Sequence, residues 1–247
     1  MKKKKIAFIS LTSCEGCQIT LLDLGEKFFK FLEKVELANF DLIEDEPFPK
    51  GKVDIIFVEG VPITKEDIKI LKKARKKAKI LVAMGACAIL GGVPEMKEYQ
   101  GREKTIRHIY RHLLKVPNPE IKEIDKFVKV DFYIPGCPIS GEEFLKYAKE
   151  LIKGKIPKIL QRPVCLECQK RGTKEYFLNK KTLCLGPVIL GGCGAVCPNN
   201  NFPCWGCRGF LKNVNVKRFL ENLTKLGISK EREEEILEIF GLKDQIN

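Results

Sequence analysis

Eleven cysteines carry the most evident chemistry of this 247-residue sequence, and they fall into two groups. The first group is spread along the amino-terminal part of the chain and consists of Cys14, Cys17, Cys87 and Cys137. The second group is crowded together and consists of Cys165, Cys168, Cys184, Cys193, Cys197, Cys204 and Cys207. Because a reducing cytosol disfavours structural disulfides, thiols in such numbers usually bind metal there. We therefore expect metal centres held by thiolates.

The first four cysteines all follow predicted strands. Cys14 and Cys17 form a C-x-x-C pair on the loop after the first strand, and Cys87 and Cys137 each follow a later strand. Because the carboxyl ends of parallel strands meet at one edge of an open α/β sheet, the four thiols should lie together there. We interpret them as the ligands of one iron–sulfur cluster. The amides that begin the next helix, at residues 17–20, are expected to point toward this anion.

Three other interpretations compete for the first group. A redox dithiol accounts for Cys14 and Cys17 but gives Cys87 and Cys137 no role. Buried structural thiols are common, although four of them on ligand-type loops fit that interpretation poorly. Structural zinc prefers paired C-x-x-C knuckles, whereas the arrangement here is two, one and one. A dinucleotide site is not predicted, because the first strand-to-helix turn lacks G-x-G-x-x-G.

The second group has the spacing C-x2-C-x15-C-x8-C-x3-C-x6-C-x2-C. Two four-thiolate clusters need eight ligands, so either one ligand is not a cysteine or one centre has three irons. Glu167 and Glu175 are candidate oxygen ligands, although an exposed charge is the simpler interpretation of each. His108 and His112 lie on a predicted helix at residues 102–115 and are interpreted as surface residues. A zinc ribbon built from the outer C-x2-C pairs would leave the three central cysteines without a role.

The elements that must position these cysteines change character along the chain. Up to residue 153, predicted strands alternate with helices, which indicates a doubly wound parallel sheet. These strands are expected at residues 5–10, 40–43, 53–58, 79–84 and 127–134, with a helix at 18–37 and helix caps at Thr64 and Ser140. Three domains are predicted: residues 1–155, a cysteine-rich domain at 156–212 that metal would have to stabilise, and a helical tail at 213–247.

Composition and charge narrow the function classes. The formal charge is +13, from 45 basic and 32 acidic residues. Because lysines and glutamates are interleaved along the whole chain, as on a solvated surface, we do not expect nucleic-acid binding. The apolar run Ile6–Leu11 is too short for a signal sequence, and no stretch approaches a membrane span. We therefore expect a cytoplasmic protein without direct membrane insertion.

Several motifs together resemble a known family, the small subunit of cytoplasmic multimeric nickel–iron hydrogenases of the group 3 type, found in archaea and some bacteria. The matching motifs occur in the family's order. They are S-C-E-G-C-Q at 13–18, V-E-G at 58–60, G-A-C-A at 85–88, P-G-C-P at 135–138, C-L-G-P at 184–187, C-G-A-V-C-P at 193–198 and C-W-G-C at 204–207.

The resemblance implies a flavodoxin-like domain and three iron–sulfur clusters, mostly of the 4Fe–4S type. By position, the proximal cluster maps onto Cys14, Cys17, Cys87 and Cys137, and the middle cluster maps onto Cys193, Cys197, Cys204 and Cys207. Cys165, Cys168 and Cys184 resemble three ligands of the distal cluster, whose fourth ligand is unknown. The chain departs there from the periplasmic enzymes, which have histidine at the position of Cys165 and one more cysteine upstream of Cys184.

The implied function is electron relay, with no catalytic residue in this chain. Electrons would pass between a nickel–iron large subunit that activates H2 and a flavin, iron–sulfur or other acceptor subunit. Glu59 and Glu15 lie beside the predicted proximal ligands, and we expect them to act as proton, cap or contact groups rather than as ligands. Two alternatives remain: a proximal-cluster subunit of the complex I or membrane hydrogenase type, and a zinc-stabilised nucleic-acid module.

Overall fold

The structure is a computed structural model that describes residues 3–44, 48–99, 120–170 and 182–246. The chain divides into two compact units, Met1–Pro157 and Lys158–Asn247, called here the first and second units. The second unit contains both the cysteine-rich stretch and the C-terminal helices. The separate folding of residues 156–212 and 213–247 stays a prediction.

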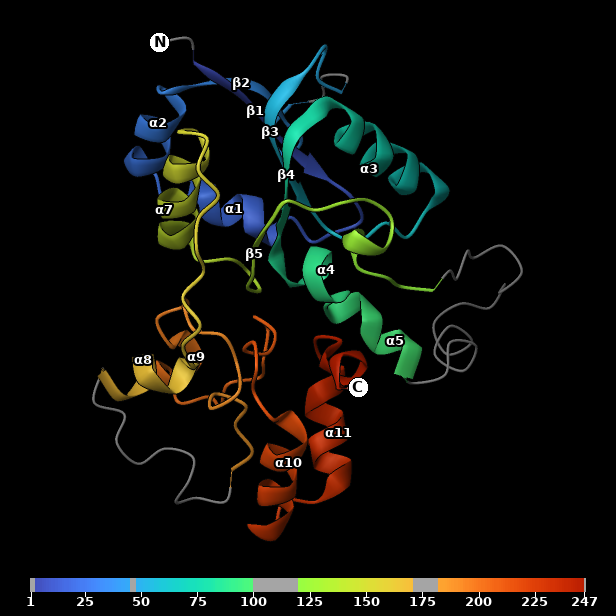
Figure 1. The fold of residues 1–247 in the computed structure, drawn as a ribbon, viewed down its shortest axis with the longest axis vertical. Helices are drawn as coiled ribbons and strands as arrows, with labels where there is room; N and C mark the ends of the chain where they lie inside the picture. The colour runs from blue at the N-terminus through green and yellow to red at the C-terminus, as the bar shows by residue number, and fades with distance from the viewer. Residues whose placement is uncertain (1–2, 45–47, 100–119, 171–181, 247) are drawn as a thin grey trace. The chain divides into compact units, whose positions relative to one another are not determined.

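The first unit is built on a five-stranded sheet in the order β2-β1-β3-β4-β5, with every neighbouring pair parallel (Figure 1). The strands are β1 (Lys4–Ser10), β2 (Val35–Phe40), β3 (Val53–Glu59), β4 (Ala78–Met84) and β5 (Phe132–Ile134). This is the flavodoxin-like order, in which the chain reverses direction between β1 and β3 and leaves a crevice at their carboxyl ends. The predicted fold class is confirmed.

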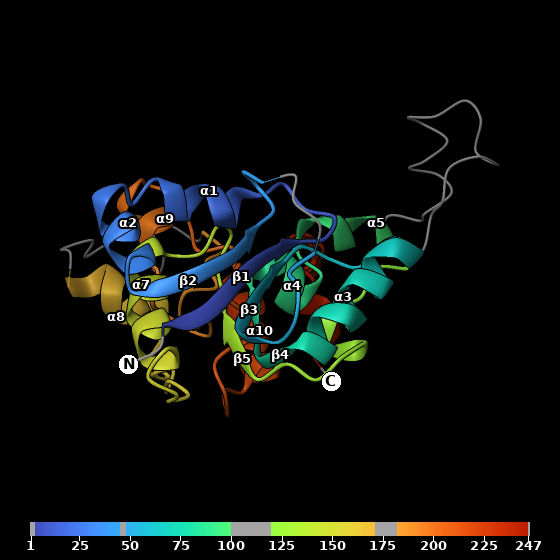
Figure 2. The same cartoon turned by 90° about the horizontal axis from the view of Figure 1, so that it is seen from above.

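Helices cover both faces of this sheet. Figures 1 and 2 show α1, α2 and α7 on one face and α3 on the other. The helical segments of the first unit are α1 (Gly16–Leu22), α2 (Glu26–Leu32), α3 (Lys65–Lys77), α4 (Gly85–Leu90), η1 (Val93–Glu95), α5 (Met96–Tyr99), η3 (Ile124–Lys126) and α7 (Gly141–Leu151). Both predicted caps are present, since Thr64 Oγ1 accepts from Asp67 N and Ser140 Oγ accepts from Glu143 N.

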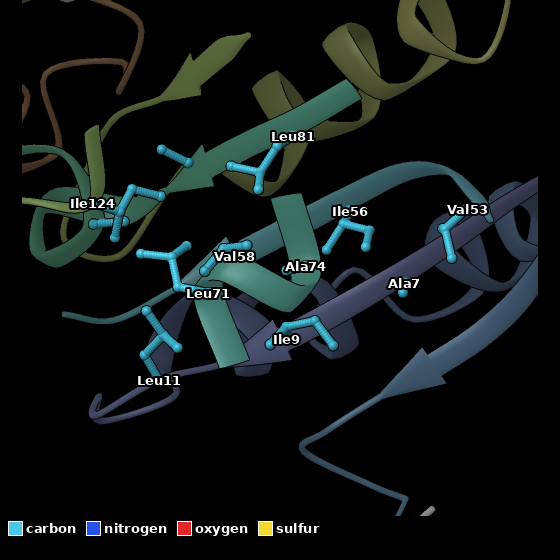
Figure 3. Packing of buried hydrophobic residues seen from close by; sticks show 12 residues of the cluster. Ala7, Ile9, Leu11, Val53, Ile56, Val58, Leu71, Ala74, Leu81 and Ile124 are labelled. Atoms are coloured by element: carbon cyan, nitrogen blue, oxygen red, sulfur yellow. The ribbon is translucent and has the colours of Figure 1, made fainter. Parts of the chain in front are cut away.

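The two faces of the sheet are packed with different side chains. Phe8 of β1 points into an aromatic layer, with ring centroids 5.0 Å from Phe57 and 5.9 Å from Phe144 of α7. Its neighbours Ala7 and Ile9 point to the opposite face, into the aliphatic cluster between the strands and α3 (Figure 3). Because both faces are buried, the strands are continuously apolar rather than alternating.

Two predicted elements have different limits in the structure. The helix predicted at 18–37 is interrupted at Gly25, whose φ of 52° is unfavourable for other residues, and it resumes as α2. Residues Val35–Phe40 form β2, so the strand predicted at 40–43 begins earlier. The strand predicted at 127–134 is shortened to Phe132–Ile134. The helix predicted at 102–115, with His108 and His112, lies outside the described residues.

The second unit has little regular structure around its cysteines. Its helical segments are α8 (Val164–Lys170), α9 (Val196–Asn199), α10 (Val216–Lys225), α11 (Lys230–Glu238) and η4 (Leu242–Gln245). Isolated bridges join Pro163 to Leu190 and Ile189 to Phe210. Leu242 packs so tightly on Gly206 that a Cβ there would lie 2.4 Å from Leu242 Cδ1. Among the described helices, none is long and apolar enough to cross a membrane.

Candidate metal centres

The first four thiols lie on three segments that leave the same edge of the sheet. Cys14 and Cys17 follow β1, Cys87 lies in α4 directly after β4, and Cys137 follows β5. Partial burial of the thiol, followed by the neighbouring Cys87 and Cys14, raises the pKa of Cys137 to about 11, although the residue as a whole is exposed. Burial also raises the pKa of Cys87 to about 11, with a contribution from Cys14. Three strand ends therefore deliver these four cysteines to the same edge of the sheet.

Glycine residues allow the segments that carry these cysteines to come close to one another. Gly85 has a φ of 90°, and a Cβ at that position would lie 2.6 Å from Cys17 Sγ. The Gly136 carbonyl accepts a hydrogen bond of 2.7 Å from the Ala86 amide, which joins the loops of Cys87 and Cys137. Only glycine satisfies both the backbone conformation and the space at position 85.

Glu59 lies at the end of β3 and is only 3% exposed. Its Oε1 accepts from the Cys17 amide at 3.0 Å and its Oε2 from the Gln18 amide at 3.1 Å. The carboxylate thus caps the start of α1, where negative charge is favourable. The expectation that the amides of residues 17 and 18 point at a bound anion is wrong, because Glu59 already accepts from them. Burial raises the pKa of Glu59, and these hydrogen bonds lower it in part.

Glu15 adopts a left-handed conformation, with a φ of 59°, immediately before α1. Its amide donates to Ser13 Oγ at 3.2 Å and its carbonyl accepts from the Ile19 amide at 3.0 Å. This turn is costly for a residue with a Cβ and sets the direction in which the loop presents Cys14. What the structure shows for Glu15 is a backbone role; its proposed proton or contact role stays a prediction.

The β1 loop is also bonded to the neighbouring strand and helix. The Leu11 amide donates to the Glu59 carbonyl at 2.9 Å, and the Val61 amide donates to the Thr12 carbonyl at 3.0 Å. Thr12 Oγ1 donates to Asp67 Oδ2 at 2.9 Å, at the start of α3. Sequence reasoning singled out neither Thr12 nor Asp67 for the site. The sequence predicts the helix cap at Thr64, but it does not predict the contact between Asp67 and Thr12.

In the second unit, Cys165, Cys168 and Cys184 are close neighbours. Burial raises the pKa of Cys165 to about 11, with contributions from Cys184 and then Cys168. A Cβ at Gly186 would lie 3.2 Å from Cys165 Sγ and 3.5 Å from Cys184 Sγ, so glycine leaves room beside two thiols. The arrangement agrees with a shared centre for these three cysteines.

The remaining cysteines adjoin this set. Burial raises the pKa of Cys204 well above its usual value, and Cys184, Cys207 and Cys193 add to the effect. Burial is the main cause that raises the pKa of Cys197, and the neighbouring Cys193 is the second. The Cys204 amide donates to Cys184 Sγ at 3.2 Å, so the predicted middle and distal ligand sets meet at this pair.

Two acidic candidates for the missing ligand have different outcomes. Glu167 was interpreted mainly as an exposed charge, and this is wrong: it is 9% exposed and bonded to Arg162 and Gly194. The reason is that Glu167 lies on the side of α8 that faces Arg162 and the Gly194 amide. Glu175 lies outside the described residues.

The tryptophan between Cys204 and Cys207 is partly open to solvent. Trp205 is 42% exposed and contacts Phe202 edge to face, with ring centroids 6.4 Å apart.

The donors fit iron–sulfur chemistry. All eleven cysteines are free thiols, and they lie on loops and short helices in the two units. Iron–sulfur clusters are held by thiolates, and hydrogen bonds to the sulfurs from nearby amides, such as that of Cys204, tune them. Within the described ranges, no three Cys, His, Asp or Glu side chains form a group able to hold a single metal ion.

Comparisons with known proteins place this arrangement in a family. The family described as NADH ubiquinone oxidoreductase, 20 Kd subunit, matches residues 14–151. The chain is 36% identical over 225 residues to sulfhydrogenase 2 subunit delta of Pyrococcus furiosus, covering 90% of this chain and 93% of that protein. It is 33% identical over 169 residues to the NAD-reducing hydrogenase HoxS subunit delta of Cupriavidus necator, covering 62% of this chain and 80% of that protein.

A solved structure agrees with the fold. An NAD+-reducing NiFe-hydrogenase in the H2-reduced state contains a chain that matches with a TM-score of 0.56 and 28% identity. The match covers 64% of this chain and 96% of that one. The fold and the thiol sites define a doubly wound α/β subunit of the oxidoreductase class. The chain belongs to the family of the NADH ubiquinone oxidoreductase 20 kDa subunit and its hydrogenase small-subunit relatives, which confirms the predicted family.

Proposed function

We propose that this chain is the electron-relay subunit of a nickel–iron hydrogenase and holds three iron–sulfur clusters. The observation that carries the proposal is the meeting of Cys14, Cys17, Cys87 and Cys137 at one edge of the sheet, with seven further free thiols in the second unit. Both relatives described above are named as hydrogenase subunits, and this supports H2 as the substrate of the assembled enzyme.

Each cluster is assigned its own ligands. The proximal cluster takes the four cysteines of the first unit, and the middle cluster takes Cys193, Cys197, Cys204 and Cys207. The distal cluster takes Cys165, Cys168 and Cys184, with a fourth ligand not identified among the described residues. When bound, such clusters accept and release single electrons. The chain contributes the positions of the thiolates and the exclusion of water, as at the buried Cys17, Cys184 and Cys204.

A large partner is required on the proximal side. Cys14 and Cys137 are exposed, although burial of a cluster from water favours controlled electron transfer. Apolar side chains are exposed close by: Ile19 of α1 is 45% exposed, and Val93, whose backbone hydrogen-bonds Cys87, is 47% exposed. We propose that a nickel–iron large subunit covers this edge through an extensive interface. A further flavin, iron–sulfur or other subunit would exchange electrons with the distal end.

The hydrogenase role is preferred to the complex I type. The family match ends at residue 151, but the sulfhydrogenase delta subunit aligns with 90% of the chain and so extends into the second cysteine group. A single-cluster subunit has no use for those seven thiols. We also propose that the chain works in the cytoplasm, since eleven free thiols suit a reducing compartment.

Metal analysis of the full chain, purified without air, tests the proposal. Three four-iron clusters correspond to about 12 irons and 12 sulfides per chain, with brown charge-transfer absorption. A colourless protein that contains one or two zinc ions and no sulfide would contradict the relay and support the zinc alternative.

A further inference from the structure

A short loop in the second unit is hydrogen-bonded to two buried charged side chains, one near each of its ends. This loop, Leu190–Gly194, is called here the strap, and it leads through Cys193 toward α9. The Gly191 amide donates to the Arg162 carbonyl at 2.7 Å, and the Leu190 amide donates to the Gly209 carbonyl at 3.0 Å. The strap therefore lies between the segment before α8 and the segment after Cys207.

Glu167 holds the end of the strap that carries Cys193. Its Oε2 accepts from the Gly194 amide at 2.8 Å, and its Oε1 accepts from Arg162 Nη2 at 2.9 Å. The carboxylate is 9% exposed, so both oxygens are engaged in a largely dry environment. A Cβ at Gly191 would lie 3.1 Å from Glu167 Oε1, so the strap needs glycine to come this close. Charge-assisted bonds of this kind are stronger than neutral ones.

Arg208 holds the other end of the strap. Its side chain is only 3% exposed, and it donates from Nε to the Leu190 carbonyl at 3.1 Å and from Nη2 to the Gly191 carbonyl at 3.1 Å. Arg208 directly follows Cys207, just as Glu167 lies between Cys165 and Cys168. The two C-x2-C regions of the second unit, Cys165–Cys168 and Cys204–Cys207, thus each have a buried charged residue, within or next to them, that hydrogen-bonds to the same five-residue strap.

We propose that Glu167 is a positioning residue that ties the Cys165–Cys168 region to the Cys193 region, and that it is not the missing ligand. The inference rests on the proposed function, because it concerns the clusters assigned to these cysteines. Cys165 and Cys168 belong to the proposed distal set and Cys193 to the middle set. The Glu167–Gly194 bond therefore links two ligand sets directly, and both of its carboxylate oxygens already serve this scaffold.

The charge of Glu167 also acts on both clusters. A buried carboxylate near two clusters disfavours the added electron in each, so its removal should raise both midpoint potentials. A ligand would behave differently, because its replacement disrupts the one cluster that it binds and leaves the other unchanged. The two roles can therefore be separated by experiment.

The first test uses Glu167→Gln in the full chain purified without air. Glutamine keeps one oxygen that can accept from the Gly194 amide, and it removes the charge and the second acceptor, which receives Arg162 Nη2. We expect unchanged iron content, both second-unit EPR signals present, and both midpoint potentials shifted upward. Glu221→Gln on α10 makes the same charge change at an exposed site and is the matched control, expected to shift neither potential. Loss of one signal with the other unshifted would assign Glu167 as a ligand and overturn the proposal, as would two unshifted potentials.

The second test does not need bound metal. Glu167→Ala removes the acceptor for the Gly194 amide, and we expect about tenfold faster hydrogen exchange across the strap in the metal-free full chain, as loss of one buried hydrogen bond predicts. Slow exchange in α10 and α11, which belong to the same second unit, reports whether this unit is folded in the metal-free wild type and variant. Unchanged exchange in the strap of a folded variant would overturn the proposal. If the wild-type chain bound no iron but exchange in the strap of Glu167→Ala still increased, the proposed electron-relay function would be contradicted, whereas the positioning role of Glu167 would be supported.

Discussion

The carboxylate of Glu59 and the amide of Cys17 are 3.0 Å apart, although 42 residues of chain separate them. The bond links the end of β3 to the first turn of α1 and thus fixes one proximal thiol relative to the sheet. Glu59 is therefore a positioning residue in the structure, whatever further part it takes in proton movement.

Replacement of Glu59 tests this cap. Glu59→Ala leaves the amides of Cys17 and Gln18 without an acceptor, and we expect the free energy of unfolding of the metal-free chain to fall by about 1–3 kcal/mol. Urea denaturation measures this change. Glu59→Gln keeps one acceptor oxygen and should lose clearly less. Equal stability of the alanine variant and the wild type would show that water replaces the cap at no cost.

Gly85 offers a sharper steric test. Gly85→Ala would place a Cβ 2.6 Å from Cys17 Sγ at a φ of 90°, so we expect loss of the proximal EPR signal and destabilisation of more than about 1 kcal/mol. Gly154→Ala is the matched control: its φ is 76°, and no atom lies within 4 Å of the added Cβ. The control carries the backbone strain without the contact. A normal proximal signal in Gly85→Ala would refute the close packing around Cys17.

Cysteine substitutions should affect the two units separately. Cys137→Ser removes one thiolate from the proximal set, and we expect the proximal EPR signal and electron transfer to be lost while the second-unit signals remain. Cys184→Ser is the reciprocal variant, expected to disturb the second unit and spare the proximal signal. The prediction fails if Cys137→Ser abolishes every signal in a chain that is still folded by circular dichroism.

Arg208 provides an independent test of the strap. Arg208→Met keeps an unbranched side chain that fills the buried space near the backbone, but it removes the donors to the Leu190 and Gly191 carbonyls. We expect a loss of about 1–3 kcal/mol in the free energy of unfolding, because buried carbonyls are left unsatisfied. Arg218→Met, at an exposed position on α10, should change stability by less than about 0.5 kcal/mol. Similar losses for the two variants would argue against a specific role for Arg208.

Local signals predicted much of the first unit. The apolar runs that became β1, β3 and β4 are long enough to be recognised as buried strands, and Thr64 and Ser140 were recognised as caps because their signals lie within four residues. The strand β2 was misplaced because Phe28, Phe31 and Val35 continue a helical spacing. In the structure Gly25 separates α1 from α2, and the pairing of β2 with β1 places residues 35–40 in a strand.

The amino-acid sequence alone identifies the atoms available for chemistry: eleven thiols, their spacing, and the places of the first four after predicted strands. Which groups position those thiols follows only from the folded chain. Glu59 reaches Cys17 because β3 pairs with β1, and Glu167 and Arg208 reach the strap because distant loops fold against each other. Such contacts depend on pairing between remote segments, which no local pattern encodes. From the sequence alone, a charged residue such as Glu167 is therefore interpreted as exposed, because its buried partners are known only from the fold.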